Sequence, residues 1–206
     1  MIRKMFVMIM VLSFAVLAGC GGGDAPRQFT GQVPRDQAND ADIARSSAGD
    51  LITPAATNRN VLFGVSPGTE YRAFLDFPLD GSSGGSIIPA NARIVSADLE
   101  VFVNSVNVTT PIPTLLDLVT YSLAIGPVSA DFASQPIAFR SLTFIPSDQG
   151  NFVRIDVTSL VAAALVNRLP DVQFRFLYDF VSNANGLVEI ADGVSATAPL
   201  LTITYE

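Results

Sequence analysis

Carboxylates and arginines are the side chains with which this 206-residue chain could carry out chemistry. The sequence has no His, and its only Lys, Lys4, lies with all four Met in the first 19 residues. Without His there is no His-based catalytic triad, imidazole metal site or His pH switch. Residues 20–206 have no Lys either, which excludes Schiff-base and Ser-Lys chemistry. An enzyme built from these residues would have to work through carboxylates.

The charge balance of residues 20–206 is acidic, with ten Arg against 19 Asp and Glu, a net charge of −9. No basic cluster interrupts this balance. Because neutralisation of phosphates dominates affinity for nucleic acids, we expect no nucleic-acid partner.

Asp98 and Glu100 are the best-spaced pair of carboxylates. They project from one face of an expected strand, about 7 Å apart along it, and glycoside hydrolysis needs two carboxylates about 5–5.5 Å or 6.5–9.5 Å apart. Any solvated strand face offers this spacing, so it favours outward-facing polar residues over catalysis. Glu70 and Glu189 stand singly near strand ends and have the same interpretation. We therefore predict no catalytic residue, no cofactor and no enzymatic activity.

Three Arg and Asp pairs alternate along expected strands, and cross-strand ion pairs worth about 0.2–1 kcal/mol each are their simplest interpretation. The pairs are Arg72/Asp76, Arg154/Asp156 and Arg175/Asp179. If the three strands lie side by side on one exposed face, the arginines would instead line a groove that binds glycan hydroxyls or uronate carboxylates. Arg72, Arg154 and Arg175 are therefore the candidate ligand-binding residues.

A sugar site also needs an aromatic platform, which this sequence barely offers. The chain has no Trp. Tyr71, Tyr178 and Tyr205 fall on the core-facing side of their expected strands, Tyr121 fits either side, and Phe102 is the candidate outward-facing aromatic.

Five segments alternate apolar and polar residues with a period of two, as strands with one buried face do. They are residues 71–77, 95–103, 152–157, 172–180 and 201–205, and Gly-, Pro- and Asn-containing turns separate them. One compact helix-forming run, Leu160–Asn167, follows potential caps at Asp156 and Thr158 and ends before Pro170. This pattern predicts an all-β antiparallel sandwich with one short helix near residues 158–167. Phe174 and Phe176 are both expected in its core.

The N-terminus has the features of an export signal. Arg3 and Lys4 precede an apolar run of 14 residues, Met5–Ala18, broken only by Ser13. As a helix this run would span about 21 Å, less than the ~30 Å of a bilayer core, which favours a signal peptide over a membrane span. The string Leu17-Ala18-Gly19-Cys20 that follows resembles a bacterial lipobox, in which the Cys is acylated and becomes the first residue after cleavage.

The lipobox resemblance implies a lipoprotein anchored to a membrane through lipidated Cys20. A lone Cys forms no intramolecular disulfide, and each buried acyl CH₂ contributes about 0.8 kcal/mol to anchoring. The resemblance places the protein in the cell envelope, and Gly21 in place of Asp favours the outer membrane of a Gram-negative host. The alternative is an ordinary secreted protein cut near Ala18, with Cys20 as a free thiol.

Residues 21–50 are rich in small and polar residues, with Phe29, Val33 and Ile43 as isolated large apolar residues. Such a stretch buries too little surface to offset its ordering entropy. We therefore predict a signal peptide over residues 1–19, a lipidated Cys with a flexible tether over 20–50, and a β-sandwich domain over 51–206. An edge strand in the last ten residues of the tether is the alternative.

A group of polar residues in the expected tether, Asp36, Asn39, Asp40 and Asp42, superficially resembles a calcium loop. Counted from Asp40, however, position six is Arg45, where an EF-hand needs Gly, and position twelve is not Glu. We therefore predict a solvated acidic linker and no metal site.

Most of residues 60–206 resembles DNRLRE-type domains. The resemblance is carried by four segments in the same order: Val61–Phe77, Ile88–Leu99, Phe152–Leu165 and Pro199–Tyr205. Residues 105–150 depart from it because they contain no Trp motif, and the string that names the family is not evident. The resemblance implies a jelly-roll-like sandwich on an envelope or secreted protein, some relatives of which are carbohydrate-binding modules.

Three function classes remain. A non-enzymatic structural or interaction lipoprotein, with an envelope protein or polysaccharide as partner, comes first. A carbohydrate-binding module comes second and a carboxylate-based glycan-active enzyme a distant third. An exposed aromatic strip would favour the glycan module, and two close, unpaired, buried carboxylates in a cleft would favour the enzyme.

Overall fold

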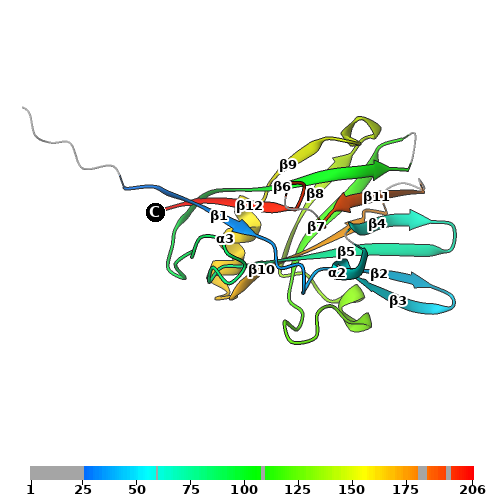
Figure 1. Cartoon of the computed structure of the whole chain (residues 1–206), viewed down its shortest axis with the longest axis horizontal. Helices are drawn as coiled ribbons and strands as arrows, with labels where there is room; N and C mark the ends of the chain where they lie inside the picture. The colour runs from blue at the N-terminus through cyan, green and yellow to red at the C-terminus, as the bar shows by residue number, and fades with distance from the viewer. Residues whose placement is uncertain (1–25, 59, 108–109, 181–184, 194–195) are drawn as a thin grey trace, which may run out of the picture.

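The fold is all-β, in a computed structural model that describes residues 26–206 except residues 59, 108–109, 181–184 and 194–195 (Figure 1). The lipobox and Cys20 lie outside the described residues. Twelve strands are described: β1 Phe29–Pro34, β2 Ala41–Ser46, β3 Gly49–Pro54, β4 Asn60–Ser66, β5 Thr69–Pro78, β6 Ile94–Val106, β7 Ile112–Val119, β8 Ala138–Phe144, β9 Phe152–Asp156, β10 Asp171–Tyr178, β11 Gly186–Ala191 and β12 Leu200–Tyr205. Short helical segments join some of them: α2 Ala55–Asn58, η1 Ser129–Ala133, η2 Pro146–Asp148 and α3 Thr158–Val166.

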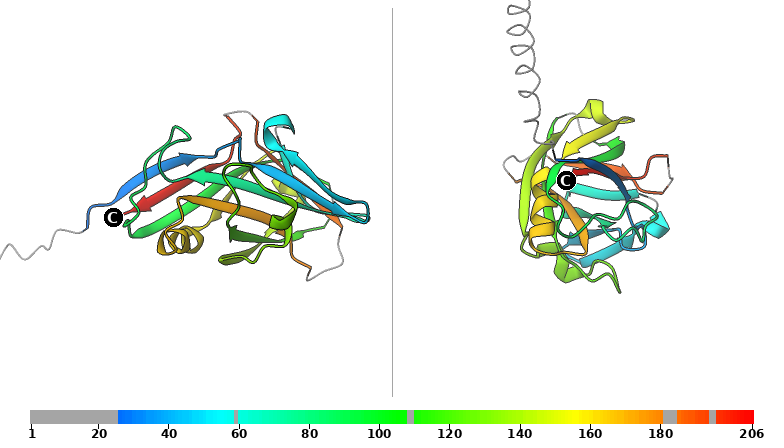
Figure 2. Two further views of the ribbon diagram at one scale, coloured as in Figure 1. Left: turned by 90° about the horizontal axis from the view of Figure 1, so that it is seen from below. Right: turned by 90° about the vertical axis from the view of Figure 1, so that its left-hand side faces the viewer.

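All the strand pairs are antiparallel, in the order β1-β12-β6-β11-β4-β5-β10-β7-β8. Two further pairings branch from this path: β2 pairs with β3 and β5, and β9 pairs with β6. The long strand β6 connects two halves of the sheet. Residues 94–102 of β6 pair with β12 and β9, and residues 103–106 pair with β11. The sheet curls over into two facing layers (Figure 2), so the expected jelly-roll-like sandwich is confirmed.

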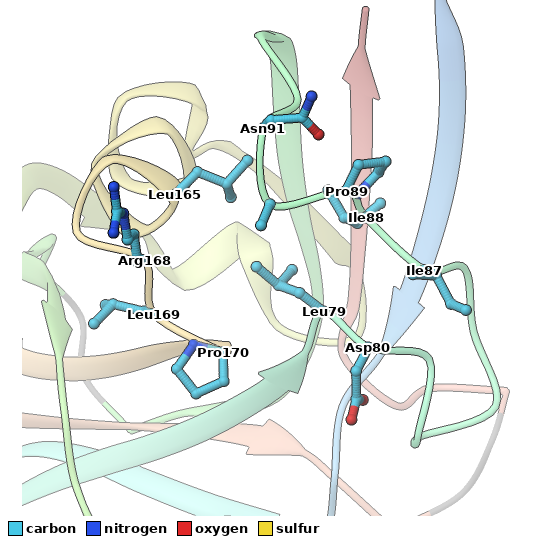
Figure 3. A pocket seen from close by; sticks show the side chains of 11 residues that line it. Leu79, Asp80, Ile87, Ile88, Pro89, Asn91, Leu165, Arg168, Leu169 and Pro170 are labelled. Atoms are coloured by element: carbon cyan, nitrogen blue, oxygen red, sulfur yellow. The ribbon is translucent and has the colours of Figure 1, made fainter.

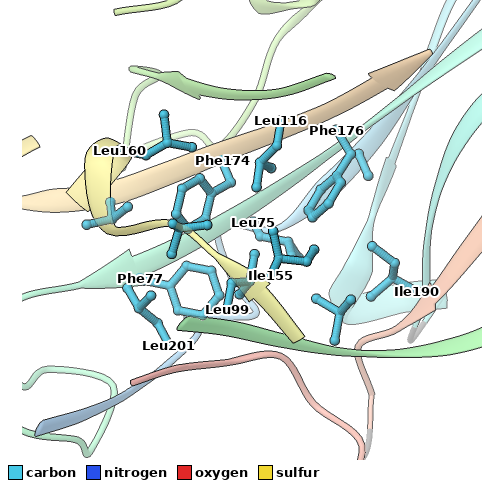
Figure 4. Packing of buried hydrophobic residues seen from close by; sticks show 14 of the residues in the cluster. Leu75, Phe77, Leu99, Leu116, Ile155, Leu160, Phe174, Phe176, Ile190 and Leu201 are labelled. Carbon is cyan, nitrogen blue, oxygen red and sulfur yellow. The ribbon is translucent and has the colours of Figure 1, made fainter. Parts of the chain in front are cut away.

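The main core lies between the layers. Leu99, Leu201 and Ile155 from the β1-β12-β6-β9 half face Phe77 and other apolar side chains of the second half (Figure 4). Within the second half, Phe77 meets Phe174 with ring centroids 5.8 Å apart, and Phe176 stacks on Phe63 at 5.3 Å. The prediction that Phe174 and Phe176 are both core residues is confirmed, since both are fully buried.

Helix α3 begins and ends close to the predicted bounds. The carboxylate of Asp156 accepts a hydrogen bond from the main-chain N–H of Thr158 at 2.9 Å, which satisfies one of the free N–H groups of the first turn. Leu160, Val161 and Ala164 are buried against the sheet. The four-residue helix α2 is an additional element that the sequence pattern did not predict.

The domain begins earlier than predicted, and this is a correction. Strands β1 and β2 and the start of β3 lie in residues 29–50, where we expected a tether. Val33 and Ile43 are fully buried, so these isolated apolar residues are core residues. Gly31 allows β1 to lie close to the loop between β5 and β6, because a Cβ at this position would come within 2.9 Å of the side chain of Ile88.

The central strands β5 and β10 are buried on both faces. A second cluster covers their outer side and is formed by Ile43, Phe74, Val119, Tyr121 and Phe132. The segment between β7 and β8, residues 120–137, supplies two of these residues. Sequence alternation predicted a solvated outer face here, and that part of the prediction is wrong.

Candidate binding site

Two of the three predicted ligand-binding arginines lie together. Arg72 is on β5 and Arg175 on β10, and these strands pair with Arg175 opposite Phe74. Both guanidinium groups donate a hydrogen bond to the main-chain oxygen of Phe132 in η1. The two positive charges thus converge on one backbone carbonyl of the segment between β7 and β8.

Arg175 is almost completely buried and its donors are bound within the chain. Its Nη2 lies 2.5 Å from Oδ2 of Asp117, and its Nε donates to the same oxygen at 3.1 Å. Its Nη1 also donates to the main-chain oxygen of Asp131 at 2.9 Å and to the hydroxyl of Ser134 at 3.0 Å. Burial raises the pKa of Asp117, and the hydrogen bond from Arg175 opposes that rise. Arg175 therefore makes a cross-strand ion pair, as expected, and its partner is the buried Asp117 of β7.

Arg72 pairs with Glu70 at 2.7 Å rather than with Asp76. Its guanidinium also lies 4.1 Å from the ring centre of Phe132, and that of Arg45 lies 3.9 Å from the same ring. Cation–π contacts of this kind contribute about 0.5–2 kcal/mol. Burial lowers the pKa of Arg72.

A cavity of about 410 Å³ adjoins these arginines, between β5, β7, β10 and the 133–136 loop. Its walls include Arg72, Asp117, Phe139 and Arg175. A uronate carboxylate would have to compete with bonds that Arg175 already makes to Asp117 and to three groups of the 131–134 segment. The arrangement is suited to holding that segment against the sheet.

Arg154 is not brought together with the other two arginines. It lies on β9, which pairs with β6 in the other half of the sheet. Its guanidinium lies 2.6 Å from Oδ2 of Asp98, and this hydrogen bond raises the pKa of Arg154. This is a cross-strand ion pair of the kind expected, between β9 and β6. Asp98 and Glu100 do lie on the solvated face of β6, where Asp98 is partly buried and Glu100 is exposed.

The outward side of β1, β12, β6 and β9 forms a polar face with one aromatic pair, and we call it the outer polar face. Phe102 and Phe152 lie opposite each other in the β6–β9 register, with ring centroids 5.1 Å apart. Phe152 is 49% exposed. Pro34 and Leu200 also lie on this face, and most other members are polar: Thr30, Gln32, Ser96, Asp98, Glu100, Arg154, Asp156, Thr202 and Thr204. The sequence did not single out Phe152 as a candidate binding residue, because its position opposite Phe102 depends on the pairing of β9 with β6.

Several buried aspartates are the main polar feature that sequence reasoning missed. Asp40, Asp42, Asp76 and Asp192 are each at most 2% exposed. Burial raises the pKa of Asp42, Asp76 and Asp192 to about 7 and that of Asp40 well above its ordinary value. Their depth keeps a substrate from reaching them. The prediction of a solvated acidic linker is wrong for Asp40 and Asp42.

Arg35 provides one positive charge for two of these carboxylates. Its Nε contacts a carboxylate oxygen of Asp192 and lies 3.6 Å from Oδ2 of Asp40. In the part of the chain that the structure describes, no three acidic or Cys side chains are arranged to hold a metal ion.

No family model matches the chain, and no curated protein matches it in sequence. Among the described residues, no helix is long and apolar enough to cross a membrane.

Proposed function

We propose that this chain is a lipid-anchored protein of the cell envelope whose β-sandwich acts by binding or by structural presence and not by catalysis. The anchor is Cys20, in the string Leu17-Ala18-Gly19-Cys20 directly after an apolar run. In a Gram-negative host the membrane would be the outer one. The partner that the domain would bind is a polysaccharide or another envelope protein.

The proposal is supported by the end of the domain at which the chain enters it. Strand β1 begins at the same end of the molecule as the end of β12, and the β2–β3 and β4–β5 hairpins lie at the opposite end (Figures 1 and 2). Phe29 at the start of β1 pairs with Tyr205 near the C-terminus. An anchor a few residues before β1 would therefore hold this end at the membrane and direct the two hairpins outwards.

Absence of catalysis is supported by the state of the carboxylates. Asp98 and Asp117 are held by arginines, and the aspartates with a raised pKa are buried away from solvent. General acid catalysis needs a carboxyl within hydrogen-bond reach of the substrate.

The anchor is tested in the full chain by fractionation and mass spectrometry. Wild-type protein should be found in the membrane fraction, with an acylated Cys20 as its N-terminal residue. Cys20→Ser should leave the membrane fraction, and Ser13→Ala, within the apolar run, should not change it. Membrane association and normal processing of Cys20→Ser would overturn the anchor.

A carbohydrate-binding module is the second candidate, and the outer polar face favours it. A half-exposed Phe152 beside hydroxyl, carboxylate and guanidinium groups offers a ring for a sugar face and polar partners for its hydroxyls. Titration calorimetry with neutral and uronate oligosaccharides tests this candidate. Phe152→Ala and Arg154→Ala should weaken binding, whereas Phe29→Ala, which lies on the core side beside Tyr205, should not. Binding that survives the first two changes would exclude this face, and turnover of the sugars would overturn the non-catalytic proposal.

A further inference from the structure

An apolar trough runs along one side of helix α3. A cavity of about 640 Å³ lies between the C-terminal end of α3 and residues 87–91, with walls formed by Leu79, Ile88, Pro89, Leu165 and Leu169 (Figure 3). A second hollow of about 350 Å³ continues towards Ile94 and Ala162. The two share Ala90, Asn91 and Leu165 in their walls, so together they form one elongated trough. Its size is in the range of small-molecule sites.

The elongated form favours a chain-like ligand. From Ala162 to Arg168 the trough follows α3 and its C-terminal turn over about 9 Å at the helical rise of 1.5 Å per residue. Few polar side chains line its larger part, and these are Asp80, Asn91 and Arg168, which are labelled in Figure 3. Asp80 is already used locally, since its carboxylate accepts a hydrogen bond from the main-chain N–H of Ser82 at 2.8 Å.

Arg168 is placed at the trough by an unusual backbone conformation. Its φ of 56° makes it the one non-Gly residue with positive φ in the described part of the chain. The surrounding bonds form a Schellman end to α3: Leu169 N–H donates to the oxygen of Ala164 at 3.0 Å, and Arg168 N–H donates to that of Leu165 at 2.9 Å. Gly is the usual residue at this position, and an L-residue there costs about 1–2 kcal/mol.

The Schellman bonds explain the backbone conformation of Arg168 but not the position of its guanidinium. Within the described residues it makes no ion pair or side-chain hydrogen bond, and it is exposed. A free positive charge at the rim of an apolar trough is complementary to an amphiphile with an anionic head.

We propose that this trough binds a single-chain amphiphile, with its hydrocarbon chain along Leu165 and Leu169 and its anionic head group, such as a fatty-acid carboxylate, on Arg168. Burial of apolar surface contributes about 25 cal/mol per Å², and the charge-assisted hydrogen bond to Arg168 orients the chain. The inference is independent of the anchor at Cys20.

The probe is monomeric dodecanoate, titrated by calorimetry into a chain that begins at Gly21. Such a chain contains every residue of both core clusters, which lie between Val33 and Ile203. Arg168→Gln removes the charge and keeps the strain, whereas Arg168→Gly removes both. Ala90→Trp adds bulk at an exposed residue common to the two hollows. Arg27→Gln changes another exposed arginine and serves as the matched control.

We expect one dodecanoate per chain, with affinity about tenfold weaker in both Arg168 variants, or about 1.4 kcal/mol. Uncharged dodecanol should bind the wild type and the Arg168 variants equally. Ala90→Trp should remove binding of both probes, and Arg27→Gln should not change it. Because Arg168→Gly relieves strain, misfolding would not explain its weaker binding.

Three outcomes would overturn the proposal. Equal affinity of dodecanoate for wild type and Arg168→Gln would exclude the arginine as the head-group site. Unchanged binding by Ala90→Trp would place the ligand outside the trough. Binding to vesicles of anionic phospholipid without binding of monomeric dodecanoate would make this surface a membrane contact instead.

Discussion

The main-chain N–H of Asp76 donates a hydrogen bond to Oδ1 of Asp40 at 2.6 Å, and both side chains are buried. This bond joins β5 to the segment that precedes β2, and it is made by a carboxyl group that lies out of reach of solvent. The carboxyl oxygens of Asp76 make no close hydrogen bond among the described residues, and contacts from Gln173 and Asn39 offset only part of the effect of burial on its pKa. The other oxygen of Asp40 lies 3.6 Å from Nε of Arg35. Ionisation of either group is therefore opposed by burial, and the fold depends on the protonation of these groups.

The free energy of unfolding should fall as the pH rises from about 4 to 7. Asp42 and Asp76 have a pKa of about 7 when folded against 3.8 when unfolded, so the folded state holds protons that the unfolded state has released. For each of these groups, the free energy of unfolding falls by about 1.4 kcal/mol for every pH unit that the pH rises across this window. Urea unfolding followed by circular dichroism from pH 4 to 8 measures the slope. A stability that is flat or rises between pH 5 and 7 would contradict the prediction.

Asp42→Asn should remove the part of this slope that belongs to Asp42. At pH 8 the variant should be more stable than the wild type by at least about 1.4 kcal/mol, and at pH 4 the two should be equal, since the wild-type carboxyl is then protonated. Asp179→Asn, a change of a carboxylate that is not buried, is the matched control and should keep the part of the slope that belongs to Asp42. The same urea titrations provide the comparison.

Arg175→Met should destabilise the domain by about 3–5 kcal/mol, because it leaves the buried carboxylate of Asp117 without a counter-charge. The 131–134 segment should also become more open to limited proteolysis, because it loses three hydrogen bonds from Arg175. Arg154→Met breaks an exposed pair and should cost less than about 1 kcal/mol. Similar losses of stability in the two variants would show that Arg175 does not hold the 131–134 segment against the sheet.

Phe176→Ala should cost about 3–5 kcal/mol, since the ring is fully buried between Phe63 and Phe144. Phe174→Ala should fall in the same range. Phe152→Ala, at a ring that is 49% exposed, should lose much less. Chemical denaturation at one pH compares the three, and a Phe176→Ala loss below that of Phe152→Ala would contradict the packing.

Arg168→Gly should stabilise the free domain by up to about 1 kcal/mol. Gly relieves the strain of a φ of 56° at the end of α3, and its greater freedom in the unfolded chain offsets part of that gain. Asn167→Gly, one residue earlier at a φ of −82°, should destabilise and is the matched control. Thermal unfolding of both variants without amphiphile measures whether each change raises or lowers the stability of the domain.

Period-two alternation predicted β6, β9 and β12 well because each buries one face and exposes the other, as Leu99 and Glu100 show. The same rule was wrong for the outer side of β5 and β10. Their polar residues Asp76 and Arg175 are covered by residues 120–137 and by β2, and such cover comes from segments distant in sequence. Parity along one strand gives no information about what packs on its outer face.

Which side chains come together in the candidate site depends on the register between paired strands, and the sequence pattern of a single strand does not contain this information. Arg154 and Arg175 look alike in sequence, each alternating with an Asp, yet their partners are Asp98 and Asp117 on neighbouring strands. The strands in residues 29–50 were missed for a different reason. Their small and polar residues are typical of a linker, and Val33 enters the core through the pairing of β1 with β12, which is distant in sequence.

That pairing determines when the fold can be completed. Thr30 in β1 and Thr204 in β12 are hydrogen-bonded through their hydroxyls although they are 174 residues apart. Contacts of such high sequence separation form late and slow the folding of β proteins. Among the described strands β1 pairs with β12, so in a chain emerging from a ribosome β1 cannot pair in this way until β12 has been made. The part of the sheet formed by β1 and β12 is therefore completed only after the strands between them have been synthesised.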